Sequence, residues 1–239
     1  PEDQLNDTRY TQPCMVAFAA GVTALLREAG ITPDYAAGLS LGEYSALQCA
    51  GVFDAKTAIS LVAFRGQAMA DAVQGRPCGM AAVLGMDRDA LKAVCSEASD
   101  AGVVECTNFN CPGQIVISGD AAAVDKAGEL AKAAGAKRVL PLKVSGPFHT
   151  SLMAPAGDAL REKFQSVDFG SMEMPVLFNC LGREMGPEDT IPALLETARS
   201  GYLDTCVLEE LGEVQALRVV SRDPEEKQGS GTETTLWFD

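Results

Sequence analysis

The chain has very little histidine, few basic residues and no long apolar run. Each of these shortages excludes some classes of mechanism or partner. Its 239 residues include one histidine, His149, so any mechanism that needs an imidazole must use it. No apolar run approaches the roughly 18 residues that a bilayer-spanning helix requires. Only 19 Lys and Arg stand against 33 Asp and Glu, a formal net charge of −14. Because such a surface repels nucleic acid and anionic membranes, neither is expected as a partner.

The eight cysteines lack a metal-binding or disulfide pattern. They stand at positions 14, 49, 78, 95, 106, 111, 180 and 206, and no two are spaced as C-x-x-C. A zinc knuckle is therefore not expected, and a chain with an ordinary core does not need a disulfide scaffold. We expect reduced thiols, no metal and a cytoplasmic protein. No signal peptide is visible, and the chain begins at Pro1 rather than Met, so its true N-terminus is expected to lie upstream.

Apolar spacing predicts an α/β body. Helices are expected over 13–30, over 55–73 after the capping residue Asp54, and over 151–164. Short apolar runs at 35–39 and 175–179 are typical of buried strands. From about residue 197 the periodicity is lost, and 221–232 contain almost no apolar residues. That end of the chain is expected to be poorly ordered.

Residues 76–143 carry six elements in a recognisable order. Strands are expected at 80–84, 103–107, 114–118 and 137–142, and helices at 87–98 and 120–134. Segment 108–113 is expected to be the turn between the middle strands. This order, strand–helix–strand–strand–helix–strand, is that of a ferredoxin-like motif. The predicted organisation is a body formed by 1–75 and 144–196, an inserted ferredoxin-like subdomain at 76–143, and a divergent tail at 197–239.

The segment Gly38-Leu39-Ser40-Leu41-Gly42 fits the pattern G-x-S-x-G between a predicted strand and a predicted helix. That context is typical of a nucleophile elbow, a tight turn that exposes the serine hydroxyl. Ser40 is the candidate nucleophile, and the Leu41 backbone N–H is a candidate donor to an oxyanion near the positive end of the helix. The alternative is a plain Gly-Ser turn that occurs by chance.

Two further residues fit this chemistry. His149 follows the last subdomain strand in Gly146-Pro147-Phe148-His149. A lone histidine is usually a surface or core residue, but His149 is the sole available base for Ser40, and a Ser–His pair is the smallest unit for acyl transfer. Arg65 lies in an apolar helix, where it either reaches the surface or clamps a carboxylate with its planar guanidinium.

Five segments, in order along 8–192, together resemble the malonyl-CoA:acyl-carrier-protein transacylase family. They are Thr11-Gln12-Pro13, Gly38 to Leu47, Phe64-Arg65-Gly66, Asn108 to Gln114, and Ser145-Gly146-Pro147-Phe148-His149. The resemblance implies a hydrolase-like α/β body with a parallel sheet and a ferredoxin-like subdomain. It also implies malonyl transfer from malonyl-CoA to the phosphopantetheine thiol of acyl carrier protein in fatty-acid biosynthesis, without a cofactor.

The resemblance also implies roles for individual residues. Ser40 would be the acylated nucleophile, His149 its base, and Arg65 the partner of the malonyl carboxylate. In related acyltransferases a Phe before the His accompanies malonyl and a Ser accompanies methylmalonyl, so Phe148 favours malonyl. Carrier proteins of this pathway are acidic, so a local basic surface is expected to dock them; Lys132, Lys137 and Arg138 are the candidates. We expect a monomer.

The sequence departs from the family at both ends. The family begins with a strand and a Gly-Gln-Gly loop, which is absent before Pro1, and the chain after about Thr197 does not resemble it. A shifted reading frame or a misassembled gene end would produce such a tail. Two alternatives therefore stay open: a serine esterase or thioesterase, which also uses G-x-S-x-G, and an inactive fragment that keeps the dyad.

Overall fold

The computed structural model describes residues 2–142, 146–200, 218–220 and 233–235. The chain divides into two units, 1–206 and 207–239. In the second, β7 (Arg218–Val220) pairs antiparallel with β8 (Glu233–Thr235), a pairing that the sequence did not indicate. Most of the predicted tail lies outside the described residues. The predicted limits of body, subdomain and tail stay predictions.

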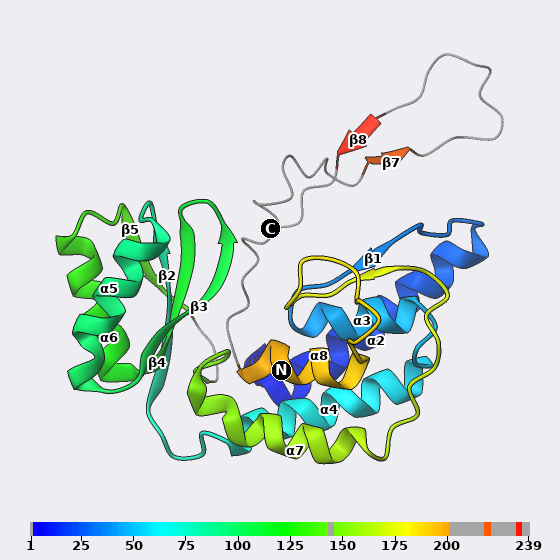
Figure 1. The fold of residues 1–239 in the computed structure, drawn as a ribbon, viewed down its shortest axis with the longest axis horizontal. Helices are drawn as coiled ribbons and strands as arrows, with labels where there is room; N and C mark the ends of the chain where they lie inside the picture. Colours follow the sequence, from blue (N-terminus) through cyan, green and yellow to red (C-terminus); the bar gives the residue numbers. More distant parts are fainter. Residues whose placement is uncertain (1, 143–145, 201–217, 221–232, 236–239) are drawn as a thin grey trace. The chain divides into compact units, whose positions relative to one another are not determined.

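The body consists of helices and a short parallel strand pair (Figure 1). β1 (Ala36–Ala37) runs parallel to β6 (Val176–Leu177), so both strands end at the same edge. This parallel pairing confirms the expected α/β class. The helices are α1 (Glu2–Leu5), α2 (Thr8–Glu28), α3 (Leu41–Cys49), α4 (Ala55–Asp71), α7 (Ala154–Phe164) and α8 (Ile191–Ser200).

Capping residues explain where several of these helices begin. Asp54 accepts a hydrogen bond from the Thr57 N–H at the start of α4, as expected. α2 begins at Thr8 rather than at residue 13, because the Asp7 side chain caps it through the Arg9 N–H and Pro13 lies inside the helix.

α1 and α8 were not predicted. The predicted helix at 151–164 begins as a 3₁₀ turn, Ser151–Met153, before α7.

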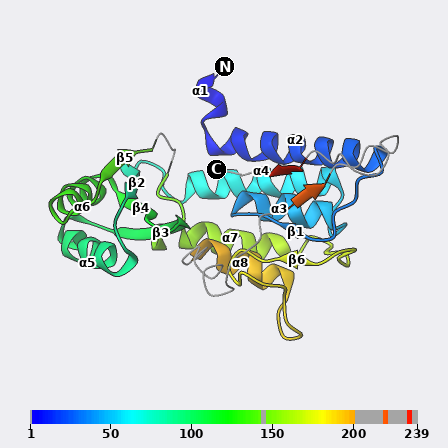
Figure 2. The ribbon, with the colours of Figure 1, turned by 90° about the horizontal axis from the view of Figure 1, so that it is seen from above.

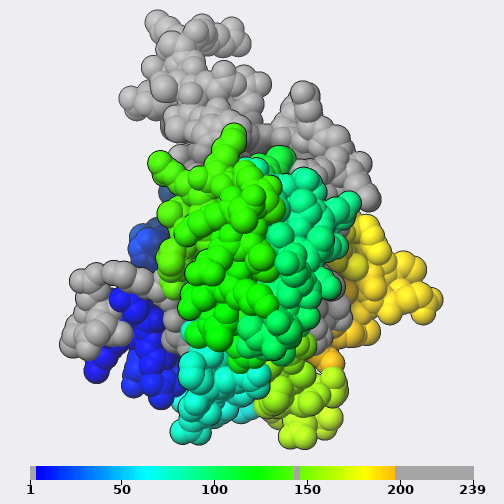
Figure 3. Space-filling view, turned by 90° about the vertical axis from the view of Figure 1, so that its left-hand side faces the viewer, coloured from blue at the N-terminus to red at the C-terminus, as the bar shows by residue number. Residues whose placement is uncertain are grey.

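The subdomain has the predicted order of six elements. These are β2 (Cys78–Leu84), α5 (Arg88–Ala98), β3 (Val104–Cys111), β4 (Gln114–Asp120), α6 (Ala121–Ala133) and β5 (Arg138–Pro141). The antiparallel sheet has the order β3-β4-β2-β5, which the ferredoxin-like motif requires. α5 and α6 cover one face, and Leu91 of α5 is buried together with Phe109 of β3 and Ile117 of β4. Figure 3 shows this subdomain surface in green.

One predicted turn was wrong in extent. β3 continues through the segment expected to be a turn and ends at Cys111, so the chain reverses at Pro112-Gly113. Gly113 has φ +76°, a conformation that glycine adopts without strain. The longer hairpin arises because Asn108 and Phe109 pair with Val116 and Ile115.

The other face of this sheet meets the loop that carries His149. Met80, Ala82 and Val116 form a small apolar cluster against Phe148. On β3, the Glu105 carboxylate accepts hydrogen bonds from the backbone N–H and the hydroxyl of Ser151. The subdomain sheet therefore contacts the segment around His149 through apolar packing and hydrogen bonds.

α2 and α4 pack with their backbones close together, and Figure 2 shows them running alongside each other. Gly66 makes this approach possible, since a Cβ there would lie 2.7 Å from the Thr8 carbonyl oxygen. A larger side chain would push the helices apart. The close packing places Gln12 of α2 beside Arg65 of α4.

α2 also has an apolar surface that the described residues leave exposed. Phe18 is 70% exposed, and the other exposed apolar residues of this stripe are Met15, Val22, Leu25 and Leu26. Apolar patches of this kind are typical of interaction surfaces. The opposite side of α2 is buried through Gln12, Val16 and Ala20. Among the described residues, no helix combines the length and apolar character needed to cross a membrane.

Candidate active site

Ser40 lies in a strained turn between β1 and α3. Its backbone has φ 51° and ψ −101°, a conformation that non-glycine residues rarely adopt. The turn is so tight that a Cβ on Gly38 would lie 2.0 Å from the Gly42 carbonyl carbon. This is the strand–turn–helix geometry of a nucleophile elbow, which projects the serine side chain away from the backbone.

The structure brings Ser40 and His149 together. The Ser40 Oγ lies 3.0 Å from the His149 Nε2, within hydrogen-bond distance. His149 is 7% exposed and has φ 64°, so its backbone is also in the left-handed region. The Thr150 hydroxyl stabilises this loop by donating to the Pro147 carbonyl at 2.7 Å. With Nε2 accepting, His149 is placed to take the hydroxyl proton of Ser40.

Arg65 does not reach the surface, so that alternative was wrong. Its side chain is 3% exposed, and Nη2 donates to the Ser40 Oγ at 3.0 Å. The guanidinium also lies 5.5 Å from the centroid of the Tyr44 ring, a cation–π contact. A cation so close to Oγ can meet a carboxylate attached to any acyl group that Ser40 accepts.

Gln12 holds Arg65 in place, a role that sequence reasoning missed. Its Oε1 accepts from Arg65 Nη1 at 2.6 Å, and its Nε2 donates to the Thr8 hydroxyl at 2.7 Å. The signal was available, since Gln12 precedes Val16 and Ala20 at helical spacing on the buried face of α2. A polar residue in such a stripe needs a polar partner.

The Leu41 backbone N–H, the candidate donor to an oxyanion, lies at the start of α3 beside Ser40. It belongs to the first residue of α3, where helix N–H groups lack intrahelical acceptors. The neighbouring Ser40 N–H donates to the Asn179 Oδ1, and the Gly42 N–H donates to the Leu39 carbonyl. Within the part of the chain that the structure describes, no acceptor is seen for Leu41. Its N–H is therefore available to a bound ligand.

All five predicted residues of the body line one cleft of about 300 Å³. They are Ser40, Leu41, Arg65, Phe148 and His149, and the cleft is completed by Leu5, Asn6, Thr8, Thr11, Gln12 and Met69. A larger open hollow of about 460 Å³ lies at Arg76, Glu105 and Asp120, but it contains neither Ser40 nor His149. We take the smaller cleft as the candidate active site because it holds the Ser–His pair.

Asn179 and Glu43 form hydrogen bonds that support the elbow, and the sequence analysis assigned no role to either residue. The Asn179 Oδ1 accepts from the Ser40 N–H at 2.6 Å, and the Asn179 N–H donates to the Glu43 Oε1 at 2.8 Å. Asn179 lies two residues after the end of β6, the neighbour of β1. Because parallel strands deliver their carboxyl ends to one edge, this position beside the elbow was a usable signal.

The Cys180 thiol lies next to Asn179 in the chain, and its pKa reflects burial in this region. Burial, and then the Glu43 carboxylate, raise the pKa of the Cys180 thiol from 9.0 to about 11. The thiolate is the form that reacts with iodoacetamide, and below the pKa its fraction rises about tenfold per pH unit. The rate of alkylation of Cys180 should therefore rise about tenfold per pH unit between pH 8 and pH 10. Peptide mapping after timed alkylation measures this, with exposed Cys14 as internal comparison. A Cys180 rate that levels off near pH 9 would contradict the expected pKa.

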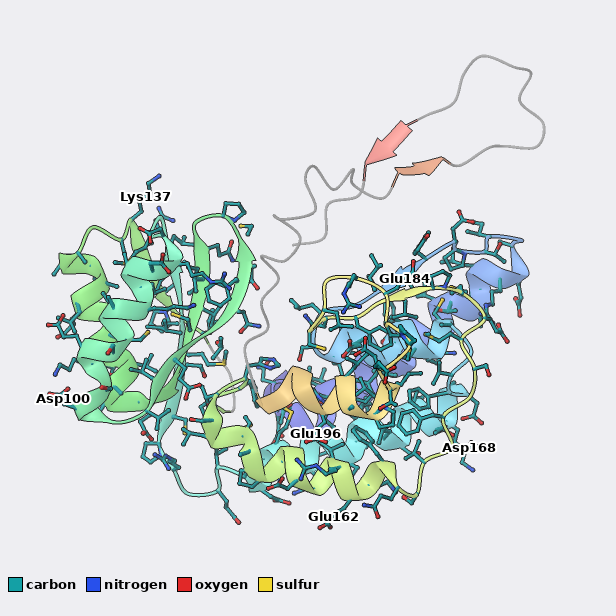
Figure 4. All side chains as sticks on the ribbon, viewed as in Figure 1. Asp100, Lys137, Glu162, Asp168, Glu184 and Glu196 are labelled. Atoms are coloured by element: carbon teal, nitrogen blue, oxygen red, sulfur yellow. The ribbon has the colours of Figure 1, made fainter. Side chains whose placement is uncertain are left out.

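The three predicted docking residues lie away from the cleft lining. Lys132 is in α6, and Lys137 and Arg138 stand before and at the start of β5. All three are exposed, and Figure 4 shows Lys137 pointing outward from the subdomain. Their role stays a prediction. Among the described residues, no group of three His, Cys, Asp or Glu side chains is arranged to hold a metal ion.

The elbow, the Ser–His pair and the parallel strands define an α/β protein with a serine placed as a candidate nucleophile. Residues 1–194 match the acyl transferase domain family, and the chain belongs to that family. It is 47% identical over 178 residues to the malonyl CoA-acyl carrier protein transacylase of Bacillus subtilis, covering 74% of this chain and 56% of the relative. The Escherichia coli K12 protein of that name is 44% identical over 180 residues, covering 75% and 58%.

Solved structures agree with these relatives. The acyl-carrier-protein S-malonyltransferase of Burkholderia pseudomallei superposes with a TM-score of 0.82 at 44% identity, covering 88% of this chain and 69% of that one. A malonyl-transacylase in complex with a type II polyketide acyl-carrier protein has a TM-score of 0.81 at 41% identity, covering 84% and 66%. The hydrolase-like fold with its ferredoxin-like insertion is thereby confirmed. The chain spans 56–58% of the length of the curated relatives it matches.

Proposed function

We propose that this chain carries the site that transfers malonyl from malonyl-CoA to the phosphopantetheine thiol of acyl carrier protein, in fatty-acid biosynthesis. The observation that carries the proposal is the double contact of the Ser40 Oγ with His149 Nε2 and Arg65 Nη2. Nucleophile, base and carboxylate-binding cation then meet at one point. The names of the similar proteins support the choice of malonyl and carrier protein.

The proposed transfer has two half-reactions. His149 takes the Ser40 proton as Oγ attacks the thioester carbonyl, and the Leu41 N–H with one further donor stabilises the oxyanion. Coenzyme A leaves as its sulfur receives the proton from His149, and malonyl-Ser40 remains. The phosphopantetheine thiol then gives its proton to His149 and attacks the ester carbonyl; the Ser40 Oγ leaves and takes the proton back from His149, which restores both residues. Side-chain groups of serine, histidine and arginine and backbone or side-chain N–H donors are the protein groups that the proposed transfer uses, so we propose that it needs no cofactor.

Arg65 and Phe148 are proposed to select malonyl. The guanidinium pairs with the free malonyl carboxylate, leaving the hydrogen bond to Oγ as the acyl group enters. Phe148 lines the same cleft and packs on the subdomain sheet, so it limits the space beside the α-carbon of the acyl group. A serine esterase needs no buried cation beside its nucleophile, and the burial of Arg65 therefore favours the transferase over that alternative. A cytoplasmic monomer stays our expectation.

A transfer assay tests the proposal. The chain is incubated with malonyl-CoA and acyl carrier protein in the phosphopantetheine form, beside a version extended at both ends to the length of the relatives. Malonyl-carrier formation by either protein, dependent on Ser40, supports the assigned site. Transfer by the extended version alone would identify the chain as an inactive fragment, and hydrolysis without transfer would favour the esterase.

Reversing the charge of the docking patch should weaken carrier recognition without affecting acylation. We expect a variant with Lys132, Lys137 and Arg138 changed to Glu to raise the KM for carrier protein while malonyl-CoA acylates Ser40 at the original rate. The effect should shrink at high salt, because exposed charges are screened over about 8–10 Å. A control with Lys56, Lys163 and Arg183 changed to Glu has the same net charge. An unchanged KM at low salt, or an equal rise in the control, would place docking elsewhere.

A further inference from the structure

We propose that Asn179 and Glu43 are positioning residues that hold Ser40 in its reactive conformation through a divided form of the helix capping box. The inference rests on the proposed function only in taking Ser40 as the nucleophile. Neither residue lines the cleft, so both would act through the backbone of the elbow rather than by touching substrate.

In the elbow, Ser40 cannot cap α3 with its side chain, and its backbone N–H needs an acceptor. Asn179 and Glu43 meet this need together. Ser40 is the residue before α3, a position where a serine side chain ordinarily accepts hydrogen bonds from the first helical N–H groups. Here its side chain makes no such bond, because Oγ contacts His149 and Arg65 instead. The Ser40 backbone N–H must also find an acceptor in a turn with a positive φ, or the strained conformation lacks support.

In an ordinary capping box, a Glu at the third helical position accepts from the N–H of the capping residue. Glu43 occupies that third position of α3, but its Oε1 accepts from the Asn179 N–H at 2.8 Å. The Asn179 Oδ1 in turn accepts from the Ser40 N–H at 2.6 Å. Asn179 is thus inserted between the two partners of the box and connects the elbow to the end of β6.

Burial makes this arrangement effective. Glu43 is 1% exposed and Asn179 is 9% exposed, so water does not readily replace either hydrogen bond. Loss of the Asn179 acceptor would leave the Ser40 N–H unsatisfied in the interior, which favours relaxation of the turn. Relaxation would move Oγ relative to His149 and rotate the adjacent Leu41 N–H away from the oxyanion position.

The contacts of Arg65 indicate that the KM for malonyl-CoA should not change when Asn179 is replaced. Arg65 is held by Gln12 from α2 and stacks on Tyr44, so its position does not depend on Asn179. Variants of Asn179 should therefore lower kcat for acylation while the KM for malonyl-CoA stays the same. A merely structural role would instead lower the unfolding temperature and affect both constants.

The decisive measurement is the rate at which a fluorophosphonate labels Ser40, because this probe reacts with activated serines without needing the malonyl pocket. Asn179→Leu removes the acceptor and should slow labelling about 10- to 100-fold, the cost of a small displacement of a reacting atom. Glu43→Leu should also slow it, whereas Glu43→Gln keeps an oxygen acceptor for the Asn179 N–H and should label within about twofold of the parent. Glu188→Leu, at an exposed carboxylate before α8, is the matched control.

Each outcome bears on the proposal. Labelling of Asn179→Leu at the parental rate would overturn it, as would equal losses in Glu43→Gln and Glu43→Leu. If Asn179→Leu does not fold, the Glu43 pair decides, together with hydrogen exchange of the Ser40 amide in the parent chain. Slow exchange of that amide supports the bond to Asn179, and exchange at the rate of an open turn overturns it. Ser40 labelling without any malonyl transfer would contradict the proposed function while leaving the positioning role supported.

Discussion

Incubation of the chain with malonyl-CoA should add one malonyl group to Ser40, and Ser40→Ala should abolish the adduct. The hydroxyl is the atom that contacts both His149 and Arg65, so its removal takes away the nucleophile itself. The loss should be at least about 10³-fold, as when members of a catalytic unit are removed from other serine enzymes. Intact-protein and peptide mass spectrometry measure the adduct and its position.

Two further variants sharpen this result. Ser60→Ala, at an exposed serine of α4, is the matched control and should keep the adduct. His149→Ala should slow adduct formation while leaving Ser40 present. An adduct on one of the cysteines, or one that persists in Ser40→Ala, would contradict the assignment of the nucleophile.

Arg65→Ala should weaken malonyl transfer far more than acetyl transfer. Malonyl carries a second carboxylate and acetyl does not, and a charge-assisted pair is worth about 1.5–3 kcal/mol, or roughly 10- to 150-fold in kcat/KM. Gln12→Leu should produce a smaller loss in the same direction, because the Gln12 Oε1 accepts from Arg65 Nη1. Steady-state kinetics with malonyl-CoA and acetyl-CoA give the ratio.

The two substrates also separate selection from a structural role of Arg65. Equal losses for malonyl and acetyl would mean that the buried guanidinium supports the fold or Ser40 rather than the carboxylate. Arg161→Ala, at an exposed arginine of α7 that pairs with Asp158, is a control that should leave the ratio unchanged.

The elements of the subdomain could be predicted from the sequence because their signals are local. Apolar periodicity and turn residues located four strands and two helices between 76 and 143, and the structure confirms their order. Helix and strand ends were less predictable. The start of α2 depends on the Asp7 side chain, and the length of β3 depends on pairing with β4 across the hairpin, which is a tertiary contact.

The candidate site divides in the same way. Ser40 was indicated by the G-x-S-x-G segment between a predicted strand and a predicted helix. His149 was indicated because it is the sole histidine and follows the last predicted subdomain strand, so both predictions came from local sequence. Arg65 left two interpretations open; its burial beside Ser40 excludes the surface position, and the carboxylate clamp stays a prediction. Gln12, Glu43 and Asn179 could not be assigned roles, since each acts through a partner distant in sequence.

The sequence by itself determined the acyl transferase family, the ferredoxin-like order and the candidate nucleophile and base, because each depends on which residue types occur and in what order. Tertiary structure alone decided how these groups meet. β1 and β6 end side by side and bring Asn179 under the elbow, while α2 approaches α4 at Gly66 and brings Gln12 to Arg65. The physical reason is that hydrogen-bond partners and burial are set by packing between segments far apart in the chain, which no local pattern contains.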